Sequence, residues 1–385
     1  MSPSRFRSLP TAAWLAAGVL GGGLGCGFEA SPSNPGGGGD DARIDGPGID
    51  APPDMAPPAM ACYGPPGAWR VCLAVPPTGT VVVPPMLDTD DDPICQPTQP
   101  TGWTPAQPEA CFIVGDTVKV EMTTAVGARP LVLVAATQVM VNVLDLAGHQ
   151  GGKPGPGAPS ADCRAFVRTP DSGGGAGGGG GGAGGDFTTI AGNGGSGDTG
   201  KNKNGQAAQP VGPPTHLRGG CSGQVGGAGD PKDIGPGGGA AYLVSGGAIV
   251  ATLVNASGGG ASGGLKQSGG SGGGSGGMIV LHAATIAAAT LIANGGGGAS
   301  GGSTLAGGAP GQDPPTAIPI RAASGGTTAG AGTGGAGFPA VDNQLDGTGG
   351  PDKAGGGGGG GGGGYIRANQ ALGSAVVFPT LDVVP

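Results

Sequence analysis

Runs of glycine constrain this chain more than any other feature of its sequence. The longest run holds ten consecutive glycines, at positions 355–364, and glycine supplies 95 of the 385 residues. Glycine loses more backbone entropy on ordering than any other residue, so an ordered run needs a specific compensation. Two structures are compatible with the runs. They could form mobile loops at the corners of a folded core, or extended helices of the polyproline II type whose backbones pack closely because side chains are absent.

Short apolar segments alternate with the glycine runs and repeat one another. Segment 278–298 matches 242–260, so that Ile286 aligns with Ile249, and residues 290–292 align with 252–254. A third copy lies at 131–148, and the aligned pairs are Val132 with Ile279, Val139 with Ile286, and Leu144 with Leu291. Repeats of 20 to 50 residues are typical of solenoids, in which each unit buries its apolar face only against its neighbours.

These repeats predict an all-β fold, an irregular parallel β-solenoid resembling a β-helix, with glycine-rich insertions over residues 123–385. Aromatic residues make up only 3% of the chain, which suits thin layers of Val, Ile, Leu and Ala. Ile249 and Ile286 are predicted at equivalent inward positions. Residues 62–122 contain short runs of strand composition separated by proline, and we expect them to form a disulfide-stapled β region that caps the solenoid.

The N-terminus has the features of an export signal. Arg5 and Arg7 precede an apolar, glycine-interrupted run at 12–24, and small residues lead to Cys26. We expect a signal peptide at 1–26 that ends in a lipobox, with Cys26 acylated and anchoring the protein to a membrane; plain secretion is the alternative. The run is too short for a good membrane-spanning helix. Residues 27–61 are rich in Gly, Pro and Asp, and are predicted to be a disordered tether.

Six cysteines remain after Cys26 is set aside. An even number in an exported chain predicts three disulfides, although the sequence alone allows fifteen pairings. Neighbour pairing is the simplest arrangement because each pair brackets a segment rich in Pro or Gly. The expected pairs are Cys62 with Cys72, Cys95 with Cys111, and Cys163 with Cys221.

Charge and motifs exclude several functions. The net charge of −8 argues against a nucleic-acid partner, which would demand a basic surface. No Cys-x-x-Cys motif is present and the three histidines are scattered, so no zinc site is predicted. The acidic stretch 88–92 could offer oxygen ligands to calcium but lacks the EF-hand pattern, and a solvated loop is the simpler interpretation. Segment 195–202 has P-loop spacing, but Asn202 replaces the Ser or Thr that binds magnesium. We expect no catalytic residues, no metal and no cofactor.

The order of parts resembles uncharacterised glycine-rich predicted lipoproteins of myxobacteria and related bacteria. The features that carry this resemblance are the signal ending in Cys26, the Asp/Pro tether, the cysteine-bearing region CYG…RVCLAVPPTG…LDTDDDPIC…ACFIVGD, and the apolar repeats followed by glycine runs. The resemblance covers most of the chain but implies no specific activity.

The sequence therefore predicts an exported structural or adhesive protein without enzymatic activity, either anchored in the outer membrane or extracellular. Its expected partners are the membrane, through Cys26, and cell-surface polysaccharide or other surface proteins. Two alternatives remain open. One is an extracellular β-helix protein that binds or cleaves polysaccharide, although the repeat strands contain Asp145 as their only carboxylate. The other is a disordered glycine-rich matrix polymer.

Overall fold

A curved parallel sheet is the framework of the computed structural model, which describes residues 60–103, 105, 107–173, 177–230, 232 and 234–384. The predicted signal peptide with Cys26, and nearly all of the predicted tether, lie outside these residues. The all-β prediction is confirmed, because the described residues contain strands and two short 3-10 turns, η1 (Asp198–Gly200) and η3 (Asp342–Gln344), but no α-helix. Accordingly, none of the described residues belongs to a helix that could cross a membrane.

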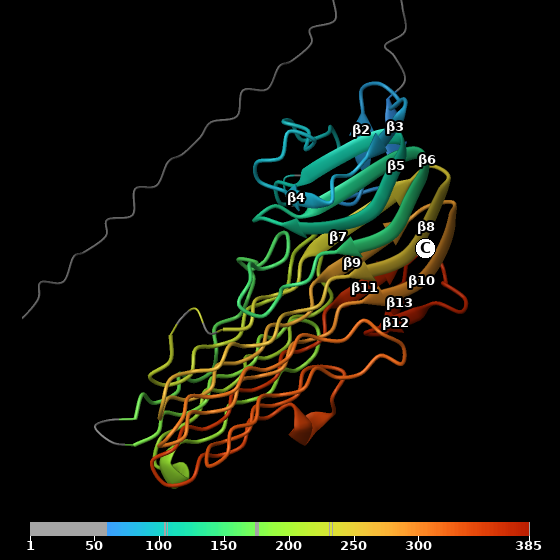
Figure 1. Cartoon of the computed structure of the whole chain (residues 1–385). Helices are drawn as coiled ribbons and strands as arrows, with labels where there is room; N and C mark the ends of the chain where they lie inside the picture. The colour runs from blue at the N-terminus through green and yellow to red at the C-terminus, as the bar shows by residue number, and fades with distance from the viewer. Residues whose placement is uncertain are drawn as a thin grey trace, which may run out of the picture. The chain divides into compact units, whose positions relative to one another are not determined.

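The strands β5 (Cys111–Val126) and β6 (Leu131–Asp145) show how the sheet is built. They pair in parallel, with Cys111 opposite Leu131, although only residues 127–130 connect them. Parallel neighbours ordinarily need a crossover of a dozen or more residues. The short connection is possible because β5 curves until its end returns close to its own start, as the arc of this strand shows (Figure 1). The sheet is therefore nearly closed on itself.

Later layers add to β6 as pairs of short strands. The first layer is β7 (Ala240–Ser245) with β8 (Ala248–Asn255), and the second is β9 (Met278–His282) with β10 (Thr285–Ile292). The third layer is β11 (Tyr365–Ala368) with β12 (Val376–Phe378), and β13 (Leu381–Val383) adds to β11 as the edge strand. Two short strands, β3 (Thr80–Val82) and β4 (Met86–Asp88), pair with β5 at the other edge.

The repeat alignment is correct at the inward positions and wrong elsewhere. Ile249 pairs with both Val139 and Ile286, as the sequence predicts. The same offset continues to the end of the strands, so Leu253 rather than Thr252 lies opposite Thr290. The alignment of Val132 with Ile279 is also off by one residue, because Leu131 and Ile279 are both partners of Ala241. A shift of one residue moves a side chain to the opposite face of a sheet.

Two apolar cores cover the two faces of the sheet. The inner core lies within the curve and includes Ile249, which is fully buried, while Ile286 is partly buried against it. The outer core covers only the first half of each layer. It packs Trp69 and Trp103 from the N-terminal region against residues such as Phe112 and Tyr242. Residues 131–135 are consequently buried on both faces, whereas buried and exposed side chains alternate along 139–142.

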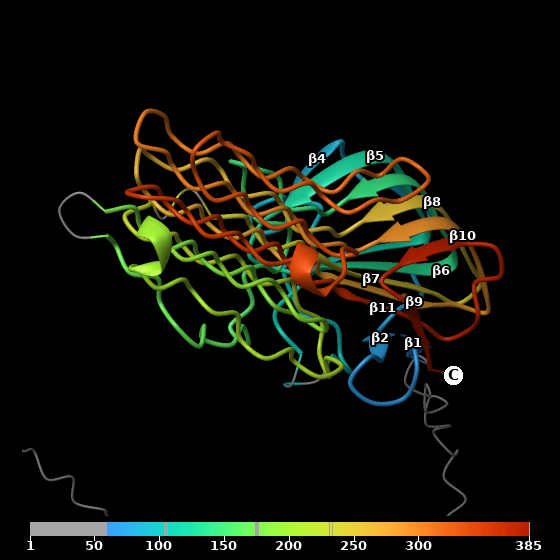
Figure 2. The same ribbon diagram turned by 90° about the horizontal axis from the view of Figure 1, so that it is seen from below.

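The glycine runs are packed structure and not projecting loops. Figures 1 and 2 both show long extended segments lying side by side next to the strands. Their backbone N–H groups donate to carbonyl oxygens of neighbouring segments at 2.7–3.1 Å, and most of their glycines are buried. We call this region the polyglycine bundle; its segments are 177–205, 218–229, 234–239, 256–277, 293–312, 323–338 and 345–364.

The run at 355–364, the central tract, has the most complete set of neighbours. Its N–H groups at 356, 359 and 362 donate to the segment 179–185, while those at 355, 358, 361 and 364 donate to 293–302. The period of three residues is that of a polyproline II helix. In total the tract exchanges hydrogen bonds with six segments: 179–185, 192–198, 268–276, 293–302, 332–338 and 345–348.

Close approach explains why the central tract contains only glycine. A Cβ placed on Gly355 would lie 1.8 Å from the carbonyl oxygen of Ser268, and one on Gly358 would lie 2.0 Å from that of Ser271. Every glycine from 355 to 364 has such a contact within 3.0 Å, and nearly all of these contacts are with backbone atoms. Alanine occurs in the bundle only where a methyl group fits, as at the buried Ala183 and Ala299.

The three expected neighbour pairs are the cysteines that lie at bonding distance. The Sγ atoms are 2.07 Å apart in Cys62–Cys72, 1.96 Å in Cys95–Cys111 and 2.06 Å in Cys163–Cys221. The first pair links β1 (Ala61–Tyr63) to β2 (Val71–Leu73), a two-stranded sheet. The second ties the chain before β5 to that strand. The predicted domain boundary at residue 122 falls inside β5, and the described residues from 60 onward form one compact unit.

Candidate functional site

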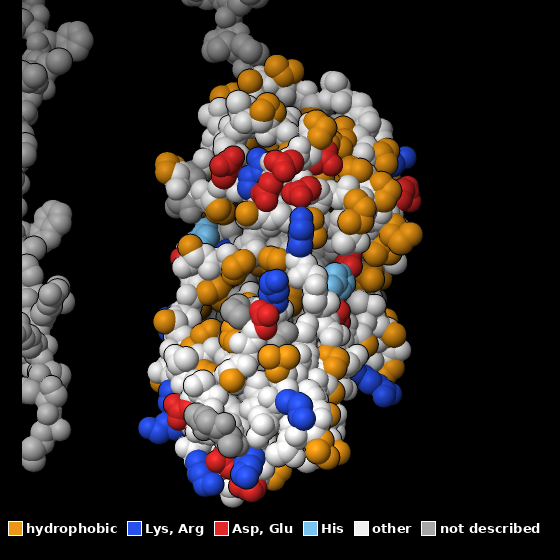
Figure 3. Space-filling view, turned by 60° about the vertical axis from the view of Figure 1, so that its left-hand side comes forward, with side chains coloured by type: hydrophobic (Ala, Val, Ile, Leu, Met, Phe, Trp, Pro, Cys, Tyr) orange, Lys and Arg blue, Asp and Glu red, His pale blue; other side chains and the backbone are white. Residues whose placement is uncertain are grey.

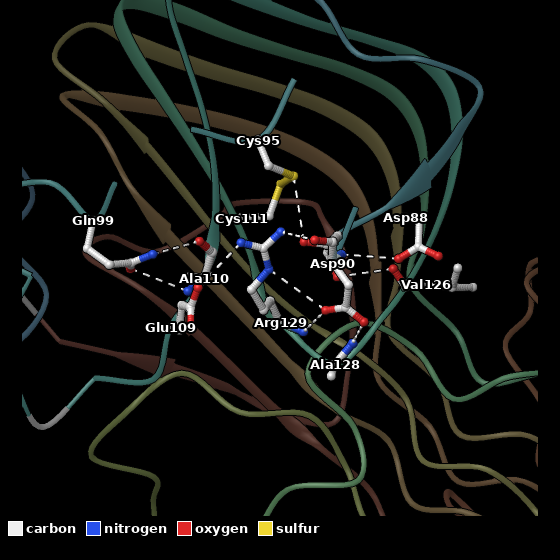
Figure 4. A network of polar contacts seen from close by, with 11 residues as sticks. Asp88, Asp90, Cys95, Gln99, Glu109, Ala110, Cys111, Val126, Ala128 and Arg129 are labelled. Carbon is white, nitrogen blue, oxygen red and sulfur yellow. Dashed lines mark hydrogen bonds and ion pairs between the residues drawn. A yellow bond between two sulfur atoms is a disulfide. The ribbon is translucent and has the colours of Figure 1, made fainter. Parts of the chain in front are cut away.

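The acidic stretch 88–92 serves as a clamp on the turn between β5 and β6. The Asp90 carboxylate accepts hydrogen bonds from the backbone N–H groups of Ala128 and Arg129, at 2.8 and 3.1 Å. The Arg129 guanidinium also donates to the Asp90 carbonyl oxygen, at 2.6 Å, and lies 3.6 Å from Glu109 (Figure 4). The described residues contain no group of three His, Cys, Asp or Glu side chains that could hold a metal ion.

A second polar cluster joins the end of β6 to the polyglycine bundle. His149 lies between two carboxylates, with Nε2 3.0 Å from Asp145 and Nδ1 3.4 Å from Asp313. These hydrogen bonds, first that to Asp145 and then that to Asp313, raise the pKa of His149 to about 10. Asp145 also accepts from the Asn255 side chain at the end of β8. Both ring nitrogens of His149 are occupied, so the cluster suits a structural clamp better than proton transfer to a substrate.

A cavity of about 350 Å³ lies beside the start of the polyglycine bundle. This volume is within the range of small-molecule sites. Asp162 and His216 face one another across part of its wall, with 2.6 Å between Asp162 Oδ2 and His216 Nε2. Ser160 donates to the same carboxylate at 3.3 Å. Four proline rings contribute to the wall and make it stiff: Pro105, Pro108, Pro130 and Pro159.

Two further side chains of this cavity carry hydrogen-bond donors without acceptors. Arg218 is only 3% exposed, and neither Nη1 nor Nη2 has a hydrogen-bond partner among the residues that the structure describes. Its guanidinium stacks on the Phe187 ring, 4.3 Å from the ring centre, and burial lowers its pKa. Gln107 is 7% exposed and accepts from the Leu217 N–H through Oε1, whereas Nε2 has no partner within the described part of the chain. Unpaired buried donors cost about 1 to 3 kcal/mol each, and more when charged, so this arrangement indicates a site built for an acceptor.

The disulfide Cys163–Cys221 holds the two sides of the cavity together. Cys163 directly follows Asp162, and Cys221 lies three residues after Arg218. The bond therefore fixes the segment bearing the carboxylate against the segment bearing the guanidinium. Fixed walls reduce the entropy that binding would otherwise cost.

A buried carboxyl group lies inside the bundle, apart from the cavity. Asp186 is 4% exposed, and its Oδ1 accepts from the Ala191 N–H at 2.8 Å, while Oδ2 has no partner in the described ranges. Burial raises the pKa of Asp186 to about 7, although hydrogen bonds from the backbone of Ala191 and Ala208 oppose the shift. The group titrates near neutral pH and makes the stability of the bundle sensitive to pH.

The sequence identified the cysteines of this region but not the cavity. In the sequence, His216 is one of three scattered histidines with no evident partner, and the structure pairs it with Asp162. The other two histidines are each in different surroundings, His149 in its clamp and His282 in β9. One sequence signal could have pointed to this cavity. Residues 216–218 precede Cys221 by only a few positions, and the predicted disulfide of Cys221 would hold the charged side chains of this segment in place.

Charged side chains do not form one broad patch of a single sign on the face drawn in Figure 3. They lie in separate small groups that mix acidic and basic residues, and much of the lower surface consists of backbone and uncharged polar atoms.

Comparison with protein-family models, with curated proteins and with solved structures found no match to this chain.

Proposed function

We propose that this chain is an exported structural or adhesive protein of the cell surface, without catalytic activity, which is either anchored in the outer membrane through a lipid on Cys26 or extracellular. The observation that carries the proposal is the polyglycine bundle. Its segments offer almost no reactive side chains, and their backbone groups are satisfied by one another. Such a region suits a rigid spacer or contact element. The three disulfides indicate an oxidising compartment, extracellular or periplasmic, in agreement with export.

The strand layers support the finer interpretation of an irregular β-solenoid. The chain returns to the same place in the sheet after 20 residues, from Cys111 to Leu131, as it would in one turn of a solenoid. Later turns are interrupted, because the chain leaves the sheet after β6, β8 and β10 to build the bundle. The glycine-rich insertions are therefore long excursions between successive turns.

The polysaccharide alternative is supported for binding more than for cleavage. Sugar cleavage ordinarily uses two carboxyl groups that flank the bond, and the pair Asp145 and Asp313 is occupied by His149. A disordered matrix polymer is disfavoured by the regular hydrogen bonding of the bundle.

Surface labelling tests the proposal. Cells producing the wild type should incorporate a palmitate analogue into the protein and lose the protein when intact cells are treated with protease. Cys26→Ser should abolish the lipid label. Equal labelling of the variant would contradict the anchor, and protection of the wild type from external protease would contradict a surface location.

A further inference from the structure

The cavity beside Arg218 has the features of a site for a negatively charged ligand. It joins a buried cation, a buried amide donor and a pocket of about 350 Å³ in one place. Neither Arg218 nor Gln107 has an acceptor for the donors concerned within the described residues. The missing partner must therefore supply acceptor oxygens.

We propose that this cavity binds the carboxylate of a small acidic molecule, with Arg218 and Gln107 as its donors. The planar guanidinium fork matches the two oxygens of a carboxylate, and a charged pair of this kind is among the stronger hydrogen-bonded contacts. Phe187 supports the opposite face of the guanidinium and leaves its edge for the ligand. The unpaired nitrogens are shielded from solvent, so the side chains must rotate before these nitrogens contact a ligand in the cavity.

The remaining wall explains why a carboxylate is accepted beside Asp162. Both contacts of the Asp162 carboxylate use Oδ2, which lies 2.6 Å from His216 Nε2 and accepts from Ser160 at 3.3 Å, so this oxygen already has partners within the protein. The proline rings Pro105 and Pro108 give an apolar surface for the carbon skeleton of the ligand. The carboxylate could come from a uronic acid of a polysaccharide or from an organic or peptide acid. This inference does not depend on the proposed surface role.

Calorimetric titration of the purified, oxidised protein distinguishes these sources. D-glucuronate and N-acetyl-L-alanine are the carboxylate probes, and D-glucose is the neutral control for the sugar ring. We expect saturable binding of at least one acid and none of glucose. Tighter binding of glucuronate identifies a sugar acid, and tighter binding of N-acetyl-L-alanine identifies a peptide-like acid. Absence of binding by both acids, or equal binding of glucose, overturns the proposal.

Matched variants locate the binding. Arg218→Lys keeps the charge but loses the fork, and Gln107→Glu replaces the donor with a carboxylate of nearly the same shape; each should weaken binding at least about tenfold, a loss of about 1.4 kcal/mol. Arg367→Met is the control, because Arg367 also stacks on an aromatic ring, that of Trp69, but lies outside the cavity. Thermal melting verifies that each variant is folded. If Arg218→Lys does not fold, Gln107→Glu decides alone, and unchanged affinity in a folded variant of either kind contradicts the assignment.

Discussion

The parallel sheet and the polyglycine bundle solve the same problem in opposite ways. In the sheet, hydrogen bonds run in one plane, and side chains such as Leu133 and Ile249 fill the space on its faces. In the bundle, successive N–H groups point in three directions, so neighbouring backbones occupy the space that side chains would need. One region is stabilised mainly by apolar burial, and the other by backbone hydrogen bonds and close backbone contacts. A buried core can therefore be encoded by the absence of side chains.

The free energies of backbone ordering and of hydrogen bonding explain why the polyglycine bundle depends on the sheet. Ordering one residue costs about 1 to 2 kcal/mol of backbone entropy, while a hydrogen bond contributes about 0.5 to 1.5 kcal/mol net. The two nearly cancel, so the bundle needs close packing and fixed ends. The central tract runs directly into β11, and the segment 256–277 joins β8 to β9. The sheet supplies these fixed ends.

The largest expected effect comes from a single methyl group in the central tract. Gly358→Ala would place its Cβ 2.0 Å from the Ser271 carbonyl oxygen. The clash is with backbone atoms and not with a flexible side chain, which could have moved away. Overpacking typically costs about 1 to 3 kcal/mol, and we expect about 3 kcal/mol or more here because the obstacle is backbone. Gly212→Ala is the control, since nothing lies within 4 Å of its Cβ. Denaturant unfolding should show a change within about 1 kcal/mol for the control. Equal unfolding free energies of Gly358→Ala and Gly212→Ala would indicate that the central tract is a loop and not packed structure.

A truncation in the sheet provides the comparison from the other region. Ile249→Ala removes a fully buried side chain from the inner core, and we expect a loss of about 2 to 5 kcal/mol in unfolding free energy. Ile286→Ala, at the paired position, should cost less because Ile286 is only partly buried. Both losses should be accompanied by faster proteolysis between residues 240 and 300. The reverse order of the two variants would show that the burial assigned to these positions is incorrect.

The sequence predicted the inward ladder of the sheet because apolar side chains repeat there. Val139, Ile249 and Ile286 pair as aligned. The sequence could not determine the strand register at Val132. Residues 131–135 are all apolar, so no alternation of apolar and polar residues shows which side chains share a face. The sequence also left the glycine runs open between loops and packed helices. A run of identical residues has no sequence pattern from which its neighbours could be predicted, and of the six segments around the central tract only 345–348 lies within ten residues of it in sequence.

The Arg218 cavity was not predictable for a related reason. Gln107 and Arg218 are far apart in the chain, and their segments meet in the fold, where the Leu217 N–H donates to Gln107 Oε1 at 3.0 Å. By contrast, the disulfides could be paired from sequence because each connects neighbouring cysteines.

A smaller effect should appear in the pH dependence of the bundle. The pKa of Asp186 is raised to about 7, so the folded protein holds this proton more tightly than the unfolded chain. Its contribution to stability is therefore greatest below about pH 4 and is lost as the pH rises to about 7. Asp186→Asn keeps a neutral acceptor and should remove this loss, stabilising the protein by about 1 to 3 kcal/mol at pH 8 relative to its effect at pH 4.

Thermal unfolding between pH 4 and pH 8 measures the Asp186 effect. Asp91→Asn, which changes an exposed carboxylate, serves as the control and should shift stability equally at both pH values. A pH-independent difference between wild type and Asp186→Asn would contradict the burial of this carboxyl group in the bundle.

Amide hydrogen exchange over the central tract tests the main claim most directly, because it reads the backbone hydrogen bonds themselves. The N–H groups of nine of its residues, all but Gly363, donate to backbone carbonyl oxygens of other segments, while Gly363 donates to the Thr189 hydroxyl at 2.6 Å. We expect the peptide covering 355–364 to exchange as slowly as the peptide covering β6, since both lie within the most fully bonded parts of the molecule. Exchange of 355–364 at the rate of an unstructured chain, with β6 still protected, would contradict the packed bundle.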